Sequence, residues 1–336
     1  MDASILKVAL TRRLLAPVEE RLQALFDVVL HESDTPLSKQ ELLARAQNAD
    51  VLVPTLDDQL DAEFFENVGD RLKLIANFGA GIDHIDIAAA NRHKIVVTNT
   101  PSVLAEDAAD MAMALILAVP RRLVEGVRAL ETGAFTGWAP TWMLGRRVRG
   151  KKLGIIGLGR VGEAIARRAS AFGLEVHYHN RRPINEHIEA ELSATYWESL
   201  DQMLATVDIV SINCPHTPAT FHLLSRRRLE LLKPHAYVVN ISRGEIVDEV
   251  ALADMVTDGR LAGAALDVYE HGNPNEKLMN APNVVLLPHM ASATVESRLE
   301  MGGRVVINIK MFADGHKPPD RVILGLDDNW TPVRRG

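Results

Sequence analysis

The chain has 336 residues, 47% of them hydrophobic and 24% charged, which is the composition of an ordinary globular protein of about two domains. The formal net charge of −7 argues against a nucleic-acid partner. The longest apolar run, residues 111–119, is too short to span a bilayer, and residues 1–4 do not begin a signal peptide. The single cysteine, Cys214, excludes an intramolecular disulfide and a multi-cysteine metal site, so we expect no metal and a reducing cytoplasmic location.

Strand-like and helical segments alternate through the first hundred residues. This alternation predicts a parallel, doubly wound sheet with helices between its strands. The predicted strands are residues 6–10, 26–30, 51–54, 72–78 and 95–98, and the predicted helices are residues 18–25, 39–47, 62–68 and 86–93.

A joint follows at residues 99–101, because Pro101 breaks regular structure and holds the preceding residue extended. A long helix is predicted over residues 103–119, ended or kinked by Pro120. Residues 133–150 read as a loop that carries Trp138 and Trp142. Exposed tryptophans on such an arm would indicate an interface, and a loop folded back into the core is the alternative.

The segment 152–182 has the order strand, glycine turn, helix, strand. Its turn, residues 157–162, reads G-L-G-R-V-G and fits the dinucleotide-binding pattern G-x-G-x-x-G. Gly157 allows the sharp turn, Gly159 lets a pyrophosphate approach the backbone, and Gly162 lets helix and strand pack closely. The helix N-terminus then offers free N–H groups to the phosphates.

The end of the next strand indicates which dinucleotide is bound. An NAD site usually carries a carboxylate there for the ribose 2′-hydroxyl. This chain has His179, Asn180, Arg181 and Arg182 instead. A guanidinium suits a 2′-phosphate because its planar fork donates two hydrogen bonds. The sequence therefore predicts NADP(H) as cofactor, with NAD(H) as the alternative if both arginines are ordinary loop cations.

The strand pattern continues after Arg182 with four apolar runs, residues 209–213, 237–241, 262–268 and 284–287. Ligands of open α/β sheets bind beyond the carboxyl ends of the strands. The last helix is predicted over residues 295–312 and can return to the first domain, and residues 315–336 read as a polar tail. The predicted fold class is α/β, with two doubly wound parallel-sheet domains.

Five motifs at strand ends occur in a fixed order along the chain. Together they resemble the D-specific 2-hydroxyacid dehydrogenases over residues 8–322, and residues 138–142 with the arginine pair resemble the glyoxylate/hydroxypyruvate reductase branch. The motifs are N-F-G-A-G-I-D at residues 77–83, the glycine turn, N-I-S-R-G at 240–244, A-L-D-V at 265–268 and L-P-H-M-A-S-A at 287–293.

The resemblance implies a flavodoxin-like substrate domain and a Rossmann nucleotide domain with a cleft between them. The substrate domain would comprise residues 1–101 and 290–336, and the nucleotide domain residues 102–289. It also implies a homodimer formed through the nucleotide domains. Trp142, on the arm, would then line the substrate pocket of the partner subunit.

The chemistry needs a carboxylate anchor and a proton donor for a 2-oxo acid. Arg243, after a predicted strand, could hold the carboxylate and polarise the ketone, although an arginine there can also pair with a helix end. His289 would donate the proton during reduction and remove it during oxidation. Ala80 and Gly81 would offer N–H groups to the carboxylate, and Leu56 is a candidate for the pocket wall.

The resemblance places further residues around the cofactor. Asp267 would accept a hydrogen bond from the nicotinamide carboxamide, and Cys214 is more simply a small packing residue than a reactive thiol. The full set of predicted cofactor-binding residues is Gly157, Gly159, Arg160, Val161, Gly162, Asn180, Arg181, Arg182, Cys214, Pro215, Thr217, Ile241, Ser242, Asp267 and Ser292.

The chain departs from the family at one position. The family has a glutamate five residues after the aspartate that matches Asp267, where it pairs with the catalytic histidine, and this chain has Gly272 there. Either Glu270 takes over that role from a shifted loop, or no carboxylate pairs with His289.

The predicted function is NADPH-dependent reduction of a small 2-oxo acid, glyoxylate or hydroxypyruvate, to the D-2-hydroxy acid. Two alternatives stay open: a dehydrogenase for a larger D-2-hydroxy acid, and a non-catalytic protein that senses the dinucleotide and binds a partner.

Overall fold

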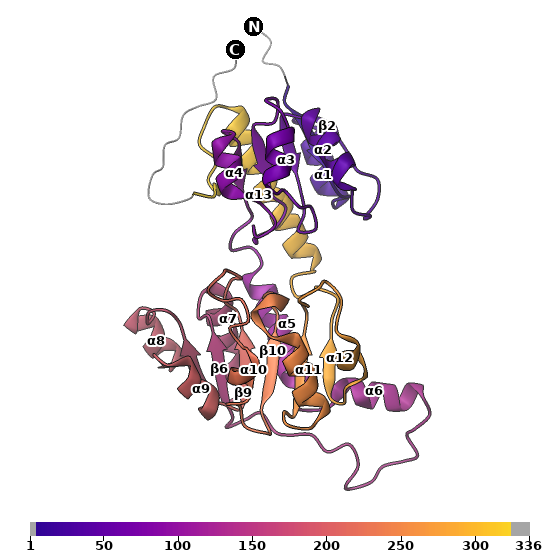
Figure 1. Ribbon diagram of the computed structural model, residues 1–336, viewed down its shortest axis with the longest axis vertical. Helices are drawn as coiled ribbons and strands as arrows, with labels where there is room; N and C mark the ends of the chain where they lie inside the picture. Colours follow the sequence, from indigo (N-terminus) through magenta and orange to yellow (C-terminus); the bar gives the residue numbers. More distant parts are fainter. Residues whose placement is uncertain (1–4, 324–336) are drawn as a thin grey trace. The chain divides into compact units, whose positions relative to one another are not determined.

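The computed structural model describes residues 5–323, so residues 1–4, where no signal peptide is expected, and the end of the predicted tail, residues 324–336, lie outside it. The chain divides into two compact units (Figure 1). Unit 1 contains Met1–Leu104 and Thr294–Gly336, and unit 2 contains Ala105–Ala293. Both units hold a parallel sheet between helices, so the predicted α/β class is confirmed.

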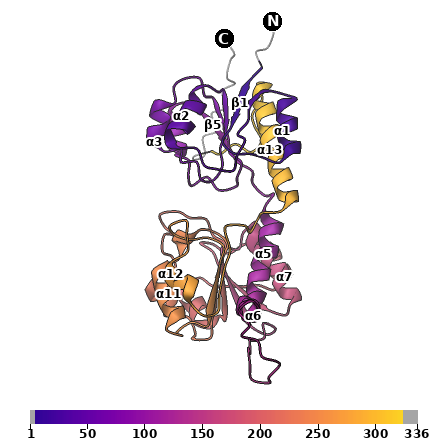
Figure 2. The same ribbon diagram turned by 90° about the vertical axis from the view of Figure 1, so that its right-hand side faces the viewer.

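The sheet of unit 1 has five parallel strands in the order β2-β1-β3-β4-β5, which is the flavodoxin-like order. Helices α2, α3 and α4 pack on one face, and α1 and α13 pack on the other (Figure 2). The elements are β1 (Lys7–Leu10), α1 (Ala16–Gln23), β2 (Asp27–Val29), α2 (Lys39–Gln47), β3 (Val51–Val53), α3 (Ala62–Asn67), β4 (Leu74–Ala76), α4 (Ile87–Arg92), β5 (Val96–Thr98) and α13 (Val295–Ala313).

Local chemistry explains where these elements begin and how closely they pack. Helix α2 starts in a capping box, in which the Ser38 hydroxyl accepts from Glu41 N–H and the Glu41 carboxylate accepts from Ser38 N–H at 2.9 Å. Helix α13 packs so closely on α1 that a Cβ at Gly302 would lie 2.2 Å from the Val18 side chain. Gly302 therefore allows the last described helix to complete the core of unit 1.

The sheet of unit 2 has seven parallel strands in the order β12-β11-β10-β9-β6-β7-β8, the Rossmann order extended by one strand. Helices α5, α7 and α8 cover one face, and α9 to α12 cover the other. The elements are α5 (Ala105–Ala118), α6 (Leu123–Glu131), β6 (Lys152–Ile156), α7 (Arg160–Ala171), β7 (Glu175–His179), α8 (Glu186–Leu192), β8 (Thr195–Tyr196), α9 (Leu200–Thr206), β9 (Ile209–Ile212), α10 (Arg226–Leu229), β10 (Tyr237–Asn240), the 3₁₀ helix η1 (Gly244–Ile246), α11 (Glu249–Thr257), β11 (Gly263–Leu266), α12 (Glu276–Asn280) and β12 (Val284–Leu286).

The sequence predicts no element over residues 121–132, and the structure has a helix there. Helix α6 follows Pro120, and Arg122 enters it with a left-handed φ of 55°. The arm that comes next is largely exposed, and Trp138 is 85% exposed, so the arm is not folded back into the core. No helix within residues 5–323 has the length and apolar character needed to cross a bilayer.

Candidate active site

Apart from Trp142 on the arm, the predicted residues of unit 2 gather at one edge of its sheet, because all seven strands are parallel and their carboxyl ends meet there. Direct contacts link each loop of this edge to its neighbour. The glycine turn after β6 contacts the loops after β7 and β9, the β9 loop contacts the β10 loop, and the β11 loop contacts those after β10 and β12. The edge is thus a continuous surface built from six loops.

Each glycine of the turn meets a different environment. Gly157 has a φ of 94°, and a Cβ there would lie 2.6 Å from the Cys214 nitrogen. A Cβ at Gly162 would lie 2.5 Å from the Gly157 carbonyl oxygen. A Cβ at Gly159, in contrast, would meet no atom within 4 Å. The first and third glycines are therefore needed for packing, whereas the second leaves open space beside the turn.

The residues around the turn also fit a dinucleotide. Helix α7 begins at Arg160 with no side-chain cap, so its first N–H groups and its positive dipole end are available to phosphates. Asn180 has a structural part, because its side chain accepts from Leu158 N–H at 2.7 Å and fixes the turn. Arg181 and Arg182 are exposed, and among residues 5–323 neither has an ion-pair or hydrogen-bond partner.

The loops after β9 and β10 are joined through Cys214 and Ser242. The Ser242 hydroxyl donates to the Cys214 carbonyl. The predicted residues Pro215 and Thr217 belong to the loop of Cys214, and Ile241 belongs to the loop of Ser242. Burial raises the pKa of the Cys214 thiol to about 11. The thiol is therefore protonated at neutral pH, as expected for a packing residue rather than a nucleophile.

Arg243 lies between β10 and η1, and its Nη1 donates to the Ser242 carbonyl at 2.9 Å. The next residue, Gly244, is pressed against the β11 loop: a Cβ there would lie 2.0 Å from the Tyr269 carbonyl carbon and 2.3 Å from the Glu270 nitrogen. The glycine that follows Arg243 is therefore required by close packing.

His289 follows β12 with a left-handed φ of 53°, an unfavourable conformation for a residue with a side chain. Asp267, which is fully buried, holds it there. Its carbonyl accepts from His289 N–H at 2.9 Å, and its two carboxylate oxygens accept from the N–H groups of Met290 and Ala291 at 2.7 Å each. Asp267 thus anchors the turn that carries His289 and leads to Ser292.

Glu270 contacts a residue that the sequence did not single out. Its Oε1 lies 2.9 Å from Nε2 of His222, in the loop after β9. Among the described residues, His222 is thus a side-chain partner of the Glu270 carboxylate. The proposed pairing of Glu270 with His289 stays a prediction.

Unit 1 presents its predicted residues at the carboxyl ends of β3 and β4. The Asn77 amide donates to the carbonyls of Gly79 and Gly81 at 3.0 and 2.9 Å, and Asn99 donates to the Ala80 carbonyl. These contacts fix the carbonyls of the turn. No described residue accepts a hydrogen bond from the N–H of Ala80 or of Gly81. Leu56 lies against this turn, because a Cβ at Gly79 would be 3.0 Å from its Cδ2.

Trp142 lies on the exposed arm of unit 2 and is 42% exposed. Within the chain its ring contacts Phe135, with the ring centroids 5.5 Å apart.

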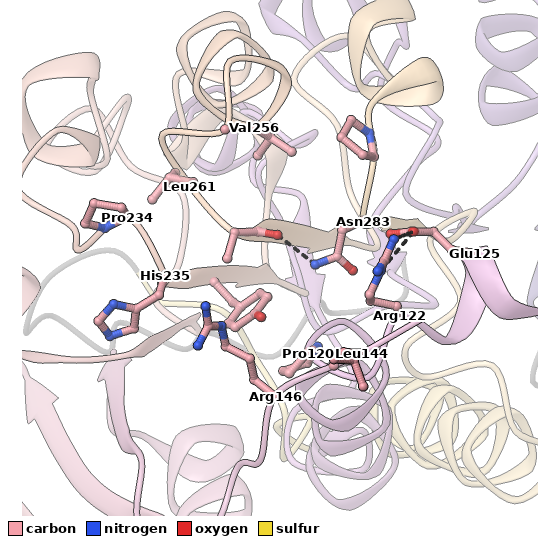
Figure 3. Close-up of a pocket in the computed structure, with 15 residues that line it drawn as sticks. Pro120, Arg122, Glu125, Leu144, Arg146, Pro234, His235, Val256, Leu261 and Asn283 are labelled. Carbon is pink, nitrogen blue, oxygen red and sulfur yellow. Dashed lines mark hydrogen bonds and ion pairs between the residues drawn. The ribbon is translucent and has the colours of Figure 1, made fainter. Parts of the chain in front are cut away.

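A separate cavity of about 510 Å³ lies at the opposite, amino edge of the unit 2 sheet (Figure 3). Tyr237, Ala262 and Asn283, which line it, precede or begin β10, β11 and β12. Arg122 and Glu125 form an ion pair at its rim. None of the predicted site residues lines this cavity, so it is distinct from the candidate active site.

Three residues that organise the site escaped the sequence-based reasoning. His222 is one of 12 histidines and has no motif around it. Asn77 binds main-chain carbonyls, and Glu249, at the start of α11, accepts from the N–H groups of Glu270 and Asn275. A side-chain pattern does not reveal such main-chain contacts. Asn77 begins the N-F-G-A-G-I-D motif, and its place in that motif is the one sequence feature that could have indicated its importance for the site.

Known proteins share the sequence pattern and the fold of this chain. A family model described as "D-isomer specific 2-hydroxyacid dehydrogenase, NAD binding domain" matches residues 113–291. The glyoxylate reductase of Aeropyrum pernix is 42% identical over 322 residues, which cover 94% of this chain and 95% of that protein.

Two solved structures share the fold over nearly the whole chain. The TT0316 protein of Thermus thermophilus has a TM-score of 0.88 and 39% identity, covering 94% of this chain and all of the other. An NADPH-dependent glyoxylate/hydroxypyruvate reductase of Sinorhizobium meliloti, solved with NADP and malonate, has a TM-score of 0.84 and 34% identity, covering 99% of each chain. The resemblance seen in the sequence motifs is confirmed. The chain belongs to the D-isomer specific 2-hydroxyacid dehydrogenase family and is an NAD(P)-dependent enzyme of that family.

Proposed function

We propose that the enzyme uses NADPH to reduce glyoxylate and hydroxypyruvate to the corresponding 2-hydroxy acids, with the D configuration where a stereocentre forms. The observation that carries this proposal is the placement of Arg243 and His289 on the same sheet edge as an open glycine turn. The names of the glyoxylate reductases that share about two fifths of the sequence support the substrate class.

The residues divide the chemistry between them. Arg243 binds the substrate carboxylate and polarises the ketone oxygen. His289 gives a proton to that oxygen as the carbonyl is reduced. Bound NADPH supplies the hydride. In unit 1, proposed as the substrate domain, the N–H groups of Ala80 and Gly81 bind the carboxylate.

Leu56 supports a small substrate. Its side chain lies against Gly79, directly beside the Ala80–Gly81 turn. A branched four-carbon side chain at that place fills space that the side chain of a larger 2-oxo acid would need. Glyoxylate and hydroxypyruvate, with no carbon or one carbon beyond the carbonyl that is reduced, fit this restriction.

The test is steady-state turnover of glyoxylate, hydroxypyruvate, pyruvate and a branched 2-oxo acid, each with NADPH and with NADH. We expect the highest kcat/KM for glyoxylate or hydroxypyruvate with NADPH. A preference for the branched acid would favour the dehydrogenase of a larger substrate. No turnover of any acid would favour a dinucleotide-sensing protein.

Arg181 and Arg182 are proposed to bind the 2′-phosphate of NADPH. Replacing either with alanine should raise the KM for NADPH by about tenfold or more, because a hydrogen bond to a charged group contributes roughly 1.5–3 kcal/mol. The KM for NADH should change little. The matched control is Arg167→Ala, which removes an arginine of α7 that pairs with Glu163 and Glu191. If the Arg181→Ala and Arg182→Ala variants both keep the wild-type KM for NADPH, the proposed binding of the 2′-phosphate by these arginines is wrong.

We further propose a homodimer formed through unit 2. Leu123, Val127 and Leu130 repeat at helical spacing on α6, and all three are exposed. Phe135, Trp138 and Trp142 continue this apolar surface along the arm. A second copy of the chain would cover it, and sedimentation equilibrium should give twice the 37.0 kDa chain mass. We also propose a cytoplasmic location, which suits a chain with one free cysteine.

A further inference from the structure

His222 and Glu270 form a side-chain pair that the proposed mechanism leaves unused. His222 lies in the loop after β9 and Glu270 in the loop after β11. The two residues are 48 positions apart in the sequence, and Nε2 of His222 lies 2.9 Å from Oε1 of Glu270. The side chains are 31% and 15% exposed, so the pair is partly shielded from water. Since an ionised carboxylate only accepts hydrogen bonds, His222 Nε2–H is the donor.

The segment that carries Arg243 lies between these two loops. On one side, His222 N–H donates to the Glu245 carbonyl at 2.8 Å, and Leu224 N–H donates to the Ile246 carbonyl at 3.0 Å. On the other side, Gly244 touches the peptide that joins Tyr269 to Glu270. The backbone from residue 243 to 246 is therefore held from both sides.

The Glu270 side of this arrangement has its own anchor. Glu249, 8% exposed at the start of α11, accepts from Glu270 N–H at 2.9 Å through one oxygen and from Asn275 N–H at 2.7 Å through the other. Glu249 thus fixes both ends of the loop that contains Gly272. The backbone of Glu270 does not depend on His222 for its position.

The backbone of His222 is strained. Its φ is +45°, an unfavourable conformation for a residue with a side chain. Its ring stacks on Phe221, with centroids 4.1 Å apart, and that ring is itself 51% exposed. The hydrogen bond to Glu270 is the contact that ties the His222 ring to a fixed part of the molecule.

We propose that His222 and Glu270 are positioning residues that clasp the Arg243 segment and so set the place of the guanidinium that binds the substrate carboxylate. This inference rests on the proposed function of Arg243. It assigns Glu270 to His222 and to the backbone around Arg243, not to the protonation of His289. Misplacing a binding group by about 1 Å can cost roughly 100-fold in rate.

Two pairs of variants test the clasp. His222→Ala and Glu270→Ala remove the hydrogen bond, whereas His222→Gln and Glu270→Gln keep a donor and an acceptor at the same reach. We expect both alanine variants to raise the KM for glyoxylate by about 10- to 100-fold, with the NADPH dissociation constant unchanged. Both glutamine variants should stay close to wild type, and the double alanine variant should be no worse than either single one.

The matched control is His235→Ala, which breaks a pair of similar length, 3.1 Å to Asp208, at the amino edge of the same sheet. It should leave the glyoxylate KM unchanged. The clasp is overturned if the alanine variants keep the wild-type KM, or if the NADPH dissociation constant rises as much as the glyoxylate KM. It is also overturned if Glu270→Gln loses kcat and shifts the pH profile, since that result would mean that Glu270 acts through its charge on His289.

A second measurement separates this inference from the proposed function. Hydrogen–deuterium exchange of residues 241–246 should be faster in both alanine variants than in the wild type and the glutamine variants. It needs no turnover, so it judges the clasp even if the wild-type enzyme fails to reduce glyoxylate, an outcome that would refute the function alone. Unchanged exchange in the alanine variants would refute the clasp alone.

Discussion

Replacing His289 with asparagine should lower kcat for glyoxylate reduction by about 100- to 10,000-fold, the usual contribution of a positioned general acid. Asparagine is the suitable replacement because His289 has a φ of 53°, and asparagine tolerates the left-handed region better than most residues. The three main-chain bonds to Asp267 can then persist, so the turn keeps its shape while the proton donor is lost. Stopped-flow measurement of NADPH oxidation gives the rate.

The matched control is His271→Asn, the same chemical change at an exposed histidine in the loop after β11. It should keep kcat within about twofold of wild type, as a surface substitution should. NADPH binding, followed by fluorescence, should be the same in both variants. If His289→Asn retains wild-type kcat, the proton must come from another group and the proposed role of His289 fails.

Replacing Asp58 with alanine should destabilise unit 1 by about 3–5 kcal/mol, because it breaks a buried ion pair and leaves the other charge behind. The Arg12 and Asp58 side chains are 8% and 1% exposed. Asp58 also accepts from the Thr11 hydroxyl at 2.5 Å and from Thr55 N–H at 2.7 Å. For a unit of this size, we expect calorimetry to give a Tm lower by about 6–20 °C.

Asp57→Ala provides the control for that measurement. Asp57 lies next to Asp58 and reaches the same arginine at 3.8 Å, but its side chain is 78% exposed. Its loss should change stability by at most about 1 kcal/mol. Equal Tm shifts in the two variants would contradict the assignment of the stabilising contact to the buried carboxylate. The result also concerns the site, since residues 55–58 include Leu56.

The two sheets could be foreseen because many of their strands are short, mainly apolar runs separated by helical patterns. Val51–Val53 and Leu74–Ala76 are buried at every position, which is what a strand covered on both faces requires. Helix α6 escaped notice because Pro120 correctly marks the end of α5. A left-handed residue, Arg122, restarts the helix after it, and nothing in the sequence announces that conformation at an arginine.

The candidate site shows the same division. The glycine turn, Arg243 and His289 could be proposed as site residues because each follows a strand in a short motif with a chemical reason. The main-chain work of Asp267 and the partner of Glu270 could not, since both depend on which loops the sheet order brings together. Asp267 precedes His289 by 22 residues, yet it binds three successive N–H groups there.

The place of α13 in unit 1 bears on how the protein is made. Residues 105–293 leave the ribosome before α13 does, and unit 2 already contains every strand and helix of its own sheet. The first hundred residues, in contrast, are synthesised well before α13. Until α13 appears, the apolar side of their sheet that it covers, which includes Val51, Leu74 and Ala76, remains open to water. During synthesis unit 2 can thus reach its native form first. The nascent amino-terminal part of unit 1 is the stretch that a chaperone would need to shield until the end of translation.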